Sequence, residues 1–154
     1  MSFWPRVRIR MRHPFFPGPA AYPAGDTPAS CAAIVGDFSE ILDAHRRGVR
    51  PERAIFVKRT FENPQLSQAE RDHLWALFEV PALAVLVDEE DVPAGFECEA
   101  HDGLHVSTRL ADVLGLPGPA QALCNCGRHG PRLLAGAAPS PRAHVAQPAM
   151  LCRA

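Results

Sequence analysis

Two short segments that carry cysteine and histidine constrain the fold of this chain more than any other feature. The first segment runs from Cys98 to His105, and the second holds Cys124 and Cys126. Thiolate sulfur and imidazole nitrogen are the donors that zinc prefers in tetrahedral structural sites. A chain that uses all four donors must fold so that the two segments meet, with two ligands from each.

The local pattern places Cys98 and His105 on a β-hairpin. Residues 96–99 and 104–107 have the composition of strands, and the Asp-Gly pair between them is typical of a tight turn. Side chains alternate between the two faces of a strand, so both residues can point to the same side. The predicted site is a closed, structural zinc site with the ligands Cys98, His105, Cys124 and Cys126.

Two other histidines compete with His105 for the fourth ligand position. His101 lies near the tip of the hairpin, and His129 follows Cys126 so closely that binding would strain the turn. Two interpretations without a metal also stay open. The cysteines and histidines could be ordinary buried thiols and surface imidazoles. Alternatively, Cys124 and Cys126 could form a redox pair, although this pair lacks the two-residue spacer of thioredoxin-like motifs.

A first helix is expected to begin after Asp37. Its carboxylate can accept a hydrogen bond from a free amide of the first turn, and Glu40 stands three residues later, as in a capping box. Gly48 is a typical helix end. The side chains expected to face the core from this helix are those of Phe38, Ile41 and Leu42.

A strand, a helix and a second strand follow. The apolar runs near 53–58 and at 82–87 have the length of buried strands. Between them Ser67 and Glu70 form a second capping box, and the helix must end before Pro81. This order favours a right-handed parallel crossover. The predicted fold class is therefore α/β: a small sheet with a strand-helix-strand unit, plus a zinc-binding β-hairpin and a Cys-x-Cys loop.

Composition divides the chain into three parts. Residues 1–30 are expected to form a basic N-terminal strand and a Pro-rich linker, because proline removes backbone donors and disfavours helix. Residues 31–134 are expected to form one zinc-binding α/β domain, since 154 residues suffice for one ordinary core. Residues 135–154 are rich in alanine and proline and are expected to be a poorly ordered tail.

Charge and hydropathy indicate little about partners. The formal net charge of -1 gives no field that selects nucleic acid or an anionic membrane. The alternating arginines at 6–12 favour an edge strand with a solvated basic face over contact with an anion. No apolar run approaches the roughly 20 residues of a membrane span, and prolines interrupt any export signal. A cytoplasmic protein without membrane association is expected, in which the odd number of cysteines, 5, does not serve a disulfide framework.

The chain also resembles a known family in three segments. Residues 77–81 (LFEVP), 97–106 (ECEAHDGLHV) and 124–133 (CNCGRHGPRL) are similar to the middle of phenylacetate-CoA ligases and their relatives, which are AMP-forming adenylating enzymes. In family members with a zinc site, the first of the two Cys/His segments supplies a cysteine and a histidine, and the second supplies two cysteines. The resemblance therefore implies the ligands Cys98, His105, Cys124 and Cys126, and it favours His105 over His101.

The parts of that family that bind ATP have no counterpart here. The chain has no Ser/Thr/Gly-rich phosphate loop, and residues 85–91 lack the tyrosine and glycine of the family's adenine-binding segment. A linker at 108–123 stands where the ribose-binding segment is expected, and Lys58 is the only lysine. Without these groups the chain cannot position ATP or stabilise the developing charge, so the resemblance implies a protein that has lost the ligase reaction.

The function expected from these observations is a noncatalytic zinc-binding module that binds a protein partner or a small-molecule ligand. One alternative is a truncated or split subunit of an acyl- or aryl-CoA ligase. A second is a regulator that contacts DNA through the N-terminal arginines. If one of the four ligands were not bound, zinc could instead activate a water molecule, with Glu97 or Glu99 as the base.

Overall fold

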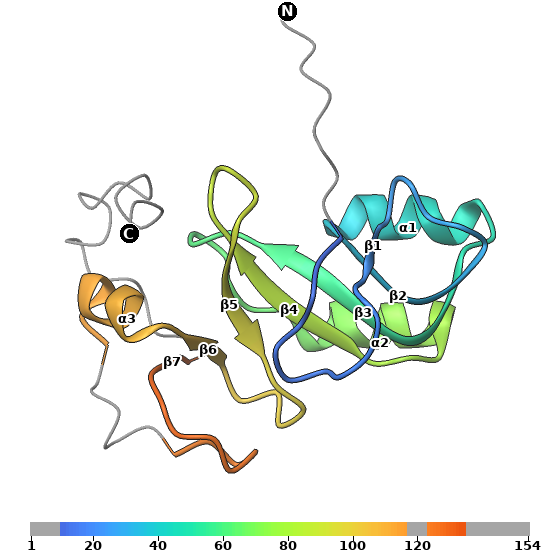
Figure 1. The fold of residues 1–154 in the computed structure, drawn as a ribbon. Coiled ribbons are helices and arrows are strands. Elements are labelled where there is room, and N and C mark those ends of the chain that lie inside the picture. Colours follow the sequence, from blue (N-terminus) through green and yellow to red (C-terminus); the bar gives the residue numbers. More distant parts are fainter. Residues whose placement is uncertain (1–9, 117–122, 135–154) are drawn as a thin grey trace, which may run out of the picture. The chain divides into compact units, whose positions relative to one another are not determined.

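The computed structural model describes residues 10–116 and 123–134 (Figure 1). Within these residues the chain forms seven strands and three helices, with both parallel and antiparallel pairing, which confirms the α/β class. Contacts between Cα atoms divide the described chain into two compact units. The first unit contains residues 10–57 and 71–82, and the second contains residues 58–70, 83–116 and 123–134.

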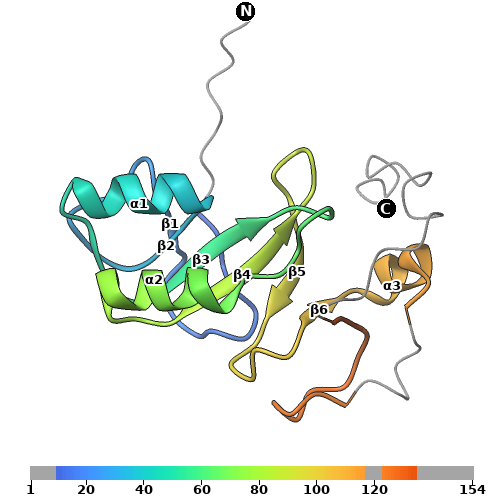
Figure 2. The same cartoon turned by 180° about the vertical axis from the view of Figure 1, so that it is seen from behind.

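Parallel strands and two helices build the first unit. The elements are β1 (Tyr22–Pro23), β2 (Ser30–Gly36), α1 (Phe38–Arg46), β3 (Arg50–Arg59) and α2 (Gln68–Phe78). Strands β1 and β3 both pair in parallel with β2, and Ile34 of β2 lies opposite Ile55 of β3. Helices α1 and α2 lie side by side (Figure 2). Between them, Phe38 packs edge-on against His73, and His45 packs edge-on against Phe78.

Helix α1 begins and ends as the sequence predicts. The amide of Glu40 donates to Asp37 Oδ1 at 2.9 Å, and the amide of Asp37 donates to Glu40 Oε2 at 3.0 Å, which is a complete capping box. Ile41 is fully buried, whereas Phe38 and Leu42 are half-buried. The expected inward face of the helix is therefore present, with Ile41 at its centre.

Helix α2 also begins at its predicted capping box, formed by reciprocal hydrogen bonds between Ser67 and Glu70. Its inward face is narrow: Leu74 and Phe78 are buried, but the Trp75 side chain is 56% exposed. Residues four positions apart share one side of a helix, whereas the position after Leu74 is turned away from it. Strand, helix and strand do follow one another as predicted, because α2 leads into β4 (Ala82–Val87).

The Pro-rich segment predicted as a linker is extended, but it packs into the first unit. The imidazole of His13 stacks on the ring of Phe56 with 4.9 Å between ring centroids. Ala21 and Ala24 are buried on either side of strand β1. Proline therefore prevents helix here without preventing packing. The domain boundaries at 30 and 134 stay a prediction, since residues 1–9 of the basic strand and the tail at 135–154 lie outside the described residues.

Several elements were not predicted, among them one long strand and one helix. Strand β2 occupies an apolar run that directly precedes Asp37. Helix α3 (Thr108–Leu114) lies where a linker was expected, so that expectation is wrong for these residues. Ser107 caps the helix by accepting from the amide of Leu110 at 3.1 Å, and Gly115 ends it in the left-handed conformation.

Antiparallel strands build the second unit. Strand β5 (Pro93–Glu97) pairs with β4 on one side and with β6 (Leu104–Val106) on the other, and β6 pairs with β7 (Arg132–Leu133). Pairing with β7 brings the second Cys/His segment beside the first. Among the described residues, none of the helices is both long and apolar enough to span a membrane.

Candidate metal centre

The predicted hairpin is present, but its turn is wider than expected. Phe96 of β5 lies opposite His105 of β6, and residues 98–103 connect the two strands. The predicted tight Asp-Gly turn is therefore wrong. The chain first turns at 98–101, where the amide of His101 donates to the carbonyl of Cys98 at 3.0 Å, and His101 itself has φ 52. A wider loop lets Cys98 stand just beyond the last paired residue of β5.

Strand alternation places Cys98 and His105 on the same side of this hairpin. Directly opposed residues of antiparallel strands share a face, so Phe96 and His105 point to one side. Cys98 follows Phe96 by two positions and points to that side as well. Glu97 belongs to the opposite face, where its Oε2 accepts a hydrogen bond from the amide of Ala84 at 2.6 Å.

The second segment forms a knuckle, by which we mean the tight turn at 124–128. The amide of Gly127 donates to the carbonyl of Cys124 at 2.8 Å, and the amide of Cys124 donates to the carbonyl of Arg128 at 3.2 Å. Gly127 has φ 86, which favours glycine at this position. After the knuckle, β7 pairs with β6 in a register that sets Arg132 opposite His105.

A second glycine lets β7 approach the hairpin loop. Gly103 has φ 83, and a Cβ atom on it would lie 2.7 Å from the carbonyl oxygen of Leu133. Any larger residue would push β7 away from the loop. The glycine that suggested a tight turn in the sequence therefore serves the contact between the two ligand-bearing segments.

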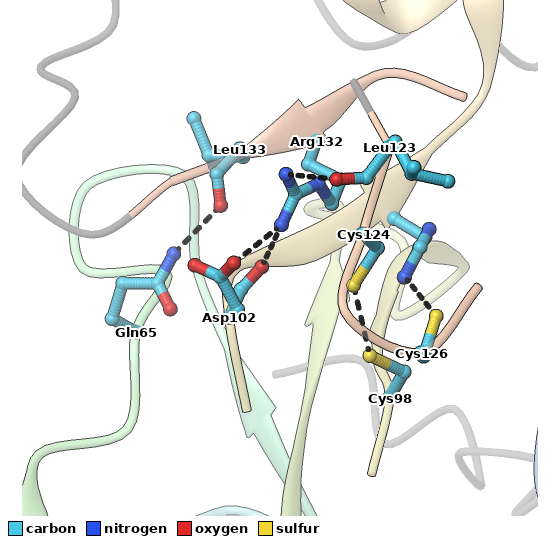
Figure 3. A network of polar contacts seen from close by, with 9 residues as sticks. Gln65, Cys98, Asp102, Leu123, Cys124, Cys126, Arg132 and Leu133 are labelled. Atoms are coloured by element: carbon cyan, nitrogen blue, oxygen red, sulfur yellow. Dashed lines mark hydrogen bonds and ion pairs between the residues drawn. The ribbon is translucent and has the colours of Figure 1, made fainter. Parts of the chain in front are cut away.

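These elements bring the four predicted ligands together. One donor atom from each of Cys98, His105, Cys124 and Cys126 lies within 4.8 Å of all the others, so the four residues could hold a metal ion. Cys98 Sγ is 3.6 Å from Cys124 Sγ, and Cys126 Sγ is 3.6 Å from His105 Nε2 (Figure 3). Cys98, Cys124 and His105 are buried, and Cys126 is half-buried.

The competing histidines lie elsewhere. His101 has a side chain that is 41% exposed, and its Nδ1 lies 3.3 Å from Glu97 Oε1. His129 is exposed after the knuckle. Neither belongs to the described group of four potential ligands. The preference for His105 over both alternatives thus agrees with where the side chains lie.

Burial and nearby amides act on the thiols in opposite directions. Burial raises the pKa of Cys98 to about 12, although the backbone amide of Ala100 donates to its sulfur and acts to lower the pKa. Burial also acts to raise the pKa of Cys126, but hydrogen bonds from the Arg128 amide and from neighbouring thiols lower it to about 7. Of these two thiols, Cys126 therefore ionises at the lower pH, and a bound cation would favour ionisation of Cys98.

His105 is held in the neutral form. Burial lowers the pKa of its imidazole from the usual 6.5, and the positive charges of Arg132 and Arg128 lower it further. Neutral imidazole is the form that binds metal ions. The histidine at this position is therefore ready to bind a metal without first losing a proton at neutral pH.

Sequence reasoning missed two arginines of the second segment that bond to the first. Arg128 Nη1 donates to both carboxylate oxygens of Glu99, at 3.1 and 2.9 Å. Arg132 Nη1 donates to the carbonyl and to Oδ2 of Asp102, both at 2.8 Å (Figure 3). A signal was present in the sequence, because the first segment carries acidic residues between its ligands and the second carries basic ones.

Comparison with family models and with curated proteins bears on the resemblance to phenylacetate-CoA ligases. Neither the models of known protein families nor the curated proteins contain a match to this chain. The likeness to phenylacetate-CoA ligases therefore stays a hypothesis that rests on the three quoted segments.

Proposed function

We propose that this chain is a noncatalytic zinc-binding module in which Cys98, His105, Cys124 and Cys126 hold one structural zinc ion. The observation that carries the proposal is the convergence of the four donor atoms to within 4.8 Å of one another. Three sulfurs and one imidazole nitrogen are a donor set that suits zinc, whose structural sites are tetrahedral.

Distances between the donors support a zinc-sized site. With bonds of about 2.0–2.3 Å, neighbouring donors of a zinc tetrahedron lie about 3.3–3.8 Å apart. The Cys98–Cys124 sulfur pair and the Cys126–His105 pair are both separated by 3.6 Å. Sulfurs in a disulfide are about 2.05 Å apart, so the two buried cysteines are arranged as separate donors.

A structural role is favoured over a catalytic one. Four protein donors fill a tetrahedron and leave no position for a reacting water molecule. Of the two carboxylates considered as a base, Glu97 lies on the other face of the hairpin and accepts from Ala84. Glu99 is paired with Arg128. Both carboxylates are therefore held by hydrogen bonds to other residues.

The proposed task of the module is binding. The resemblance to phenylacetate-CoA ligases, together with the missing ATP-binding segments, supports a module derived from such a fold. Leu123 and Leu134 flank the knuckle and β7 and are 60% and 43% exposed, which suits contact with a protein partner. A small-molecule ligand is the second class we propose. We place the module in the cytoplasm, where reducing conditions keep thiols available for zinc, with neither membrane nor nucleic acid as a partner.

Metal analysis of the purified full chain tests the zinc site. About one zinc per chain is expected, and Cys124→Ser should abolish it because a structural tetrahedron needs all its ligands. Cys31→Ala is the matched control, since Cys31 is also a buried cysteine but lies in the first unit. A folded wild-type protein that takes up no zinc, or equal zinc loss in both variants, would refute the site.

A separate assay tests the noncatalytic part of the proposal. The chain should not exchange pyrophosphate into ATP in the presence of aryl or acyl acids, because it lacks the family's phosphate loop. Acid-dependent exchange by a preparation free of host ligases would overturn this part and leave the zinc site standing.

A further inference from the structure

Arg132 is a deeply buried charged residue beside the four ligands. Its side chain contacts both of the segments that carry the ligands. Its side chain is only 10% exposed. Nη1 donates to Asp102 in the hairpin loop, and Nη2 donates to the carbonyl of Leu123 at 3.3 Å, the residue directly before Cys124 (Figure 3). One guanidinium therefore connects the loop that carries Cys98 with the start of the knuckle.

The Nε–H group of this guanidinium has no acceptor among the described residues. Arg132 Nε is buried and finds no hydrogen-bond partner among the residues that the structure describes. Buried donors on charged groups are almost always satisfied, because leaving one without an acceptor costs free energy. A buried Nε–H without an acceptor beside a cluster of thiols therefore points to an acceptor that forms only in another state of the site.

Cys124 is the group that can become this acceptor. It directly follows Leu123, whose carbonyl already accepts from Arg132 Nη2 at 3.3 Å, and Figure 3 shows the Cys124 side chain next to that of Arg132. A neutral thiol is a weak acceptor, whereas a thiolate forms strong, charge-assisted hydrogen bonds. Metal binding converts the neutral thiol into a thiolate, because metal-bound cysteine is deprotonated.

We propose that Arg132 is a positioning residue of the metal centre: it ties the hairpin loop to the knuckle and donates its Nε–H to the Cys124 thiolate when a metal ion is bound. This inference rests on the proposed function only in requiring that the four ligands bind a metal. Arg59 provides the matched comparison, because its side chain is also 10% exposed and donates to Glu70 and to the carbonyl of Asn63, both at 3.1 Å.

Nuclear magnetic resonance on the full chain tests the hydrogen bond directly. The protein is loaded with a spin-half isotope of cadmium in place of zinc, and correlations between cadmium and nitrogen-bound protons are recorded. We expect a correlation between the metal and the Arg132 Nε–H proton, transmitted through the Cys124 sulfur. Arg132→Lys assigns the signal by removing it. A residue that only supports the fold would give no such correlation.

Metal affinity gives the second measurement, by competition with a chromophoric chelator. Arg132→Gln should weaken binding by about tenfold, the equivalent of losing one charge-assisted hydrogen bond. Arg132→Lys should bind the metal more tightly than Arg132→Gln but more weakly than the wild type. A single ammonium group cannot reach all the acceptors that the planar guanidinium contacts. Arg59→Gln should change the affinity by less than about twofold, because its partners Glu70 and Asn63 are not ligands.

The outcomes separate this inference from the proposed function. If wild-type protein binds no metal, both fail. If it binds metal through the four ligands but shows no correlation to Arg132, only the inference fails, whatever the variants do. Equal loss of affinity in Arg132→Gln and Arg59→Gln would likewise overturn the specific role of Arg132. Because the correlation is recorded on wild-type protein, a variant that fails to fold does not prevent the decision.

Discussion

The two compact units bury different kinds of side chain. In the first unit the largest fully buried side chains are aliphatic, and they come from β2, α1, β3 and α2. In the second unit they include two thiols and a carboxylate beside the leucines and a valine: Val85, Leu86, Glu97, Cys98, Leu104, Cys124 and Leu133. The first unit thus follows the usual logic of hydrophobic burial, while the second buries groups whose favourable state depends on a partner.

Strand length makes the same distinction. β2 and β3 have 7 and 10 residues, whereas β6 and β7, which connect the hairpin to the knuckle, have 3 and 2. The pairing between β6 and β7 is so short that it supplies few hydrogen bonds. Regular structure therefore positions the four residues only approximately, and the proposed metal ion together with the arginine contacts would supply the remaining constraint.

Metal removal should produce the largest effect and should confine it to the second unit. Binding energies of structural zinc sites are on the order of 10–16 kcal/mol and are part of the folding free energy. After chelation, amide hydrogen exchange should become fast at 98–105 and 123–133 while 33–35 and 54–57 stay protected. Exchange mass spectrometry with and without zinc measures this difference. Equal loss of protection in both units would show that the metal stabilises both units, contrary to this prediction.

Truncating the aliphatic core of the first unit should give the next largest effect. Ile55 is fully buried in β3, so Ile55→Ala should cost about 2–5 kcal/mol through lost burial and the remaining cavity. Zinc per folded chain should not change. Urea unfolding followed by metal analysis of the folded fraction checks both expectations. Loss of zinc at full folding would show that the metal centre depends on this core.

Substituting the two histidines of the hairpin should affect metal binding differently, and His101 should give the smaller effect. His105→Ala should remove metal binding, because it deletes a donor of the proposed tetrahedron. His101→Ala should keep the metal and cost about 1 kcal/mol, since it removes a contact with the buried carboxylate of Glu97. Metal content and urea unfolding of both variants distinguish these outcomes. Zinc loss in His101→Ala alone would reject the ligand set.

Local signals predicted the boundaries of most elements well. Asp37 with Glu40 and Ser67 with Glu70 determine where α1 and α2 begin, because capping depends on residues only three positions apart. The same reasoning, applied to Ser107 and Gly115, would have found α3. Such signals do not show whether an extended segment packs, so they could not distinguish the packed segment at 13–30 from a linker.

The sequence by itself singled out Cys98, Cys124 and Cys126 as potential donors with His105 as the favoured fourth, because thiol and imidazole groups in two short segments suit few uses other than metal binding. It also determined that Cys98 and His105 share a face, since strand alternation holds over any well-formed hairpin. Only the tertiary structure decided the width of the hairpin loop, the approach of β7 over Gly103 and the burial of Arg132 between Asp102 and Leu123. These contacts join residues far apart in the chain, and their free energy depends on distances and burial that no local pattern encodes.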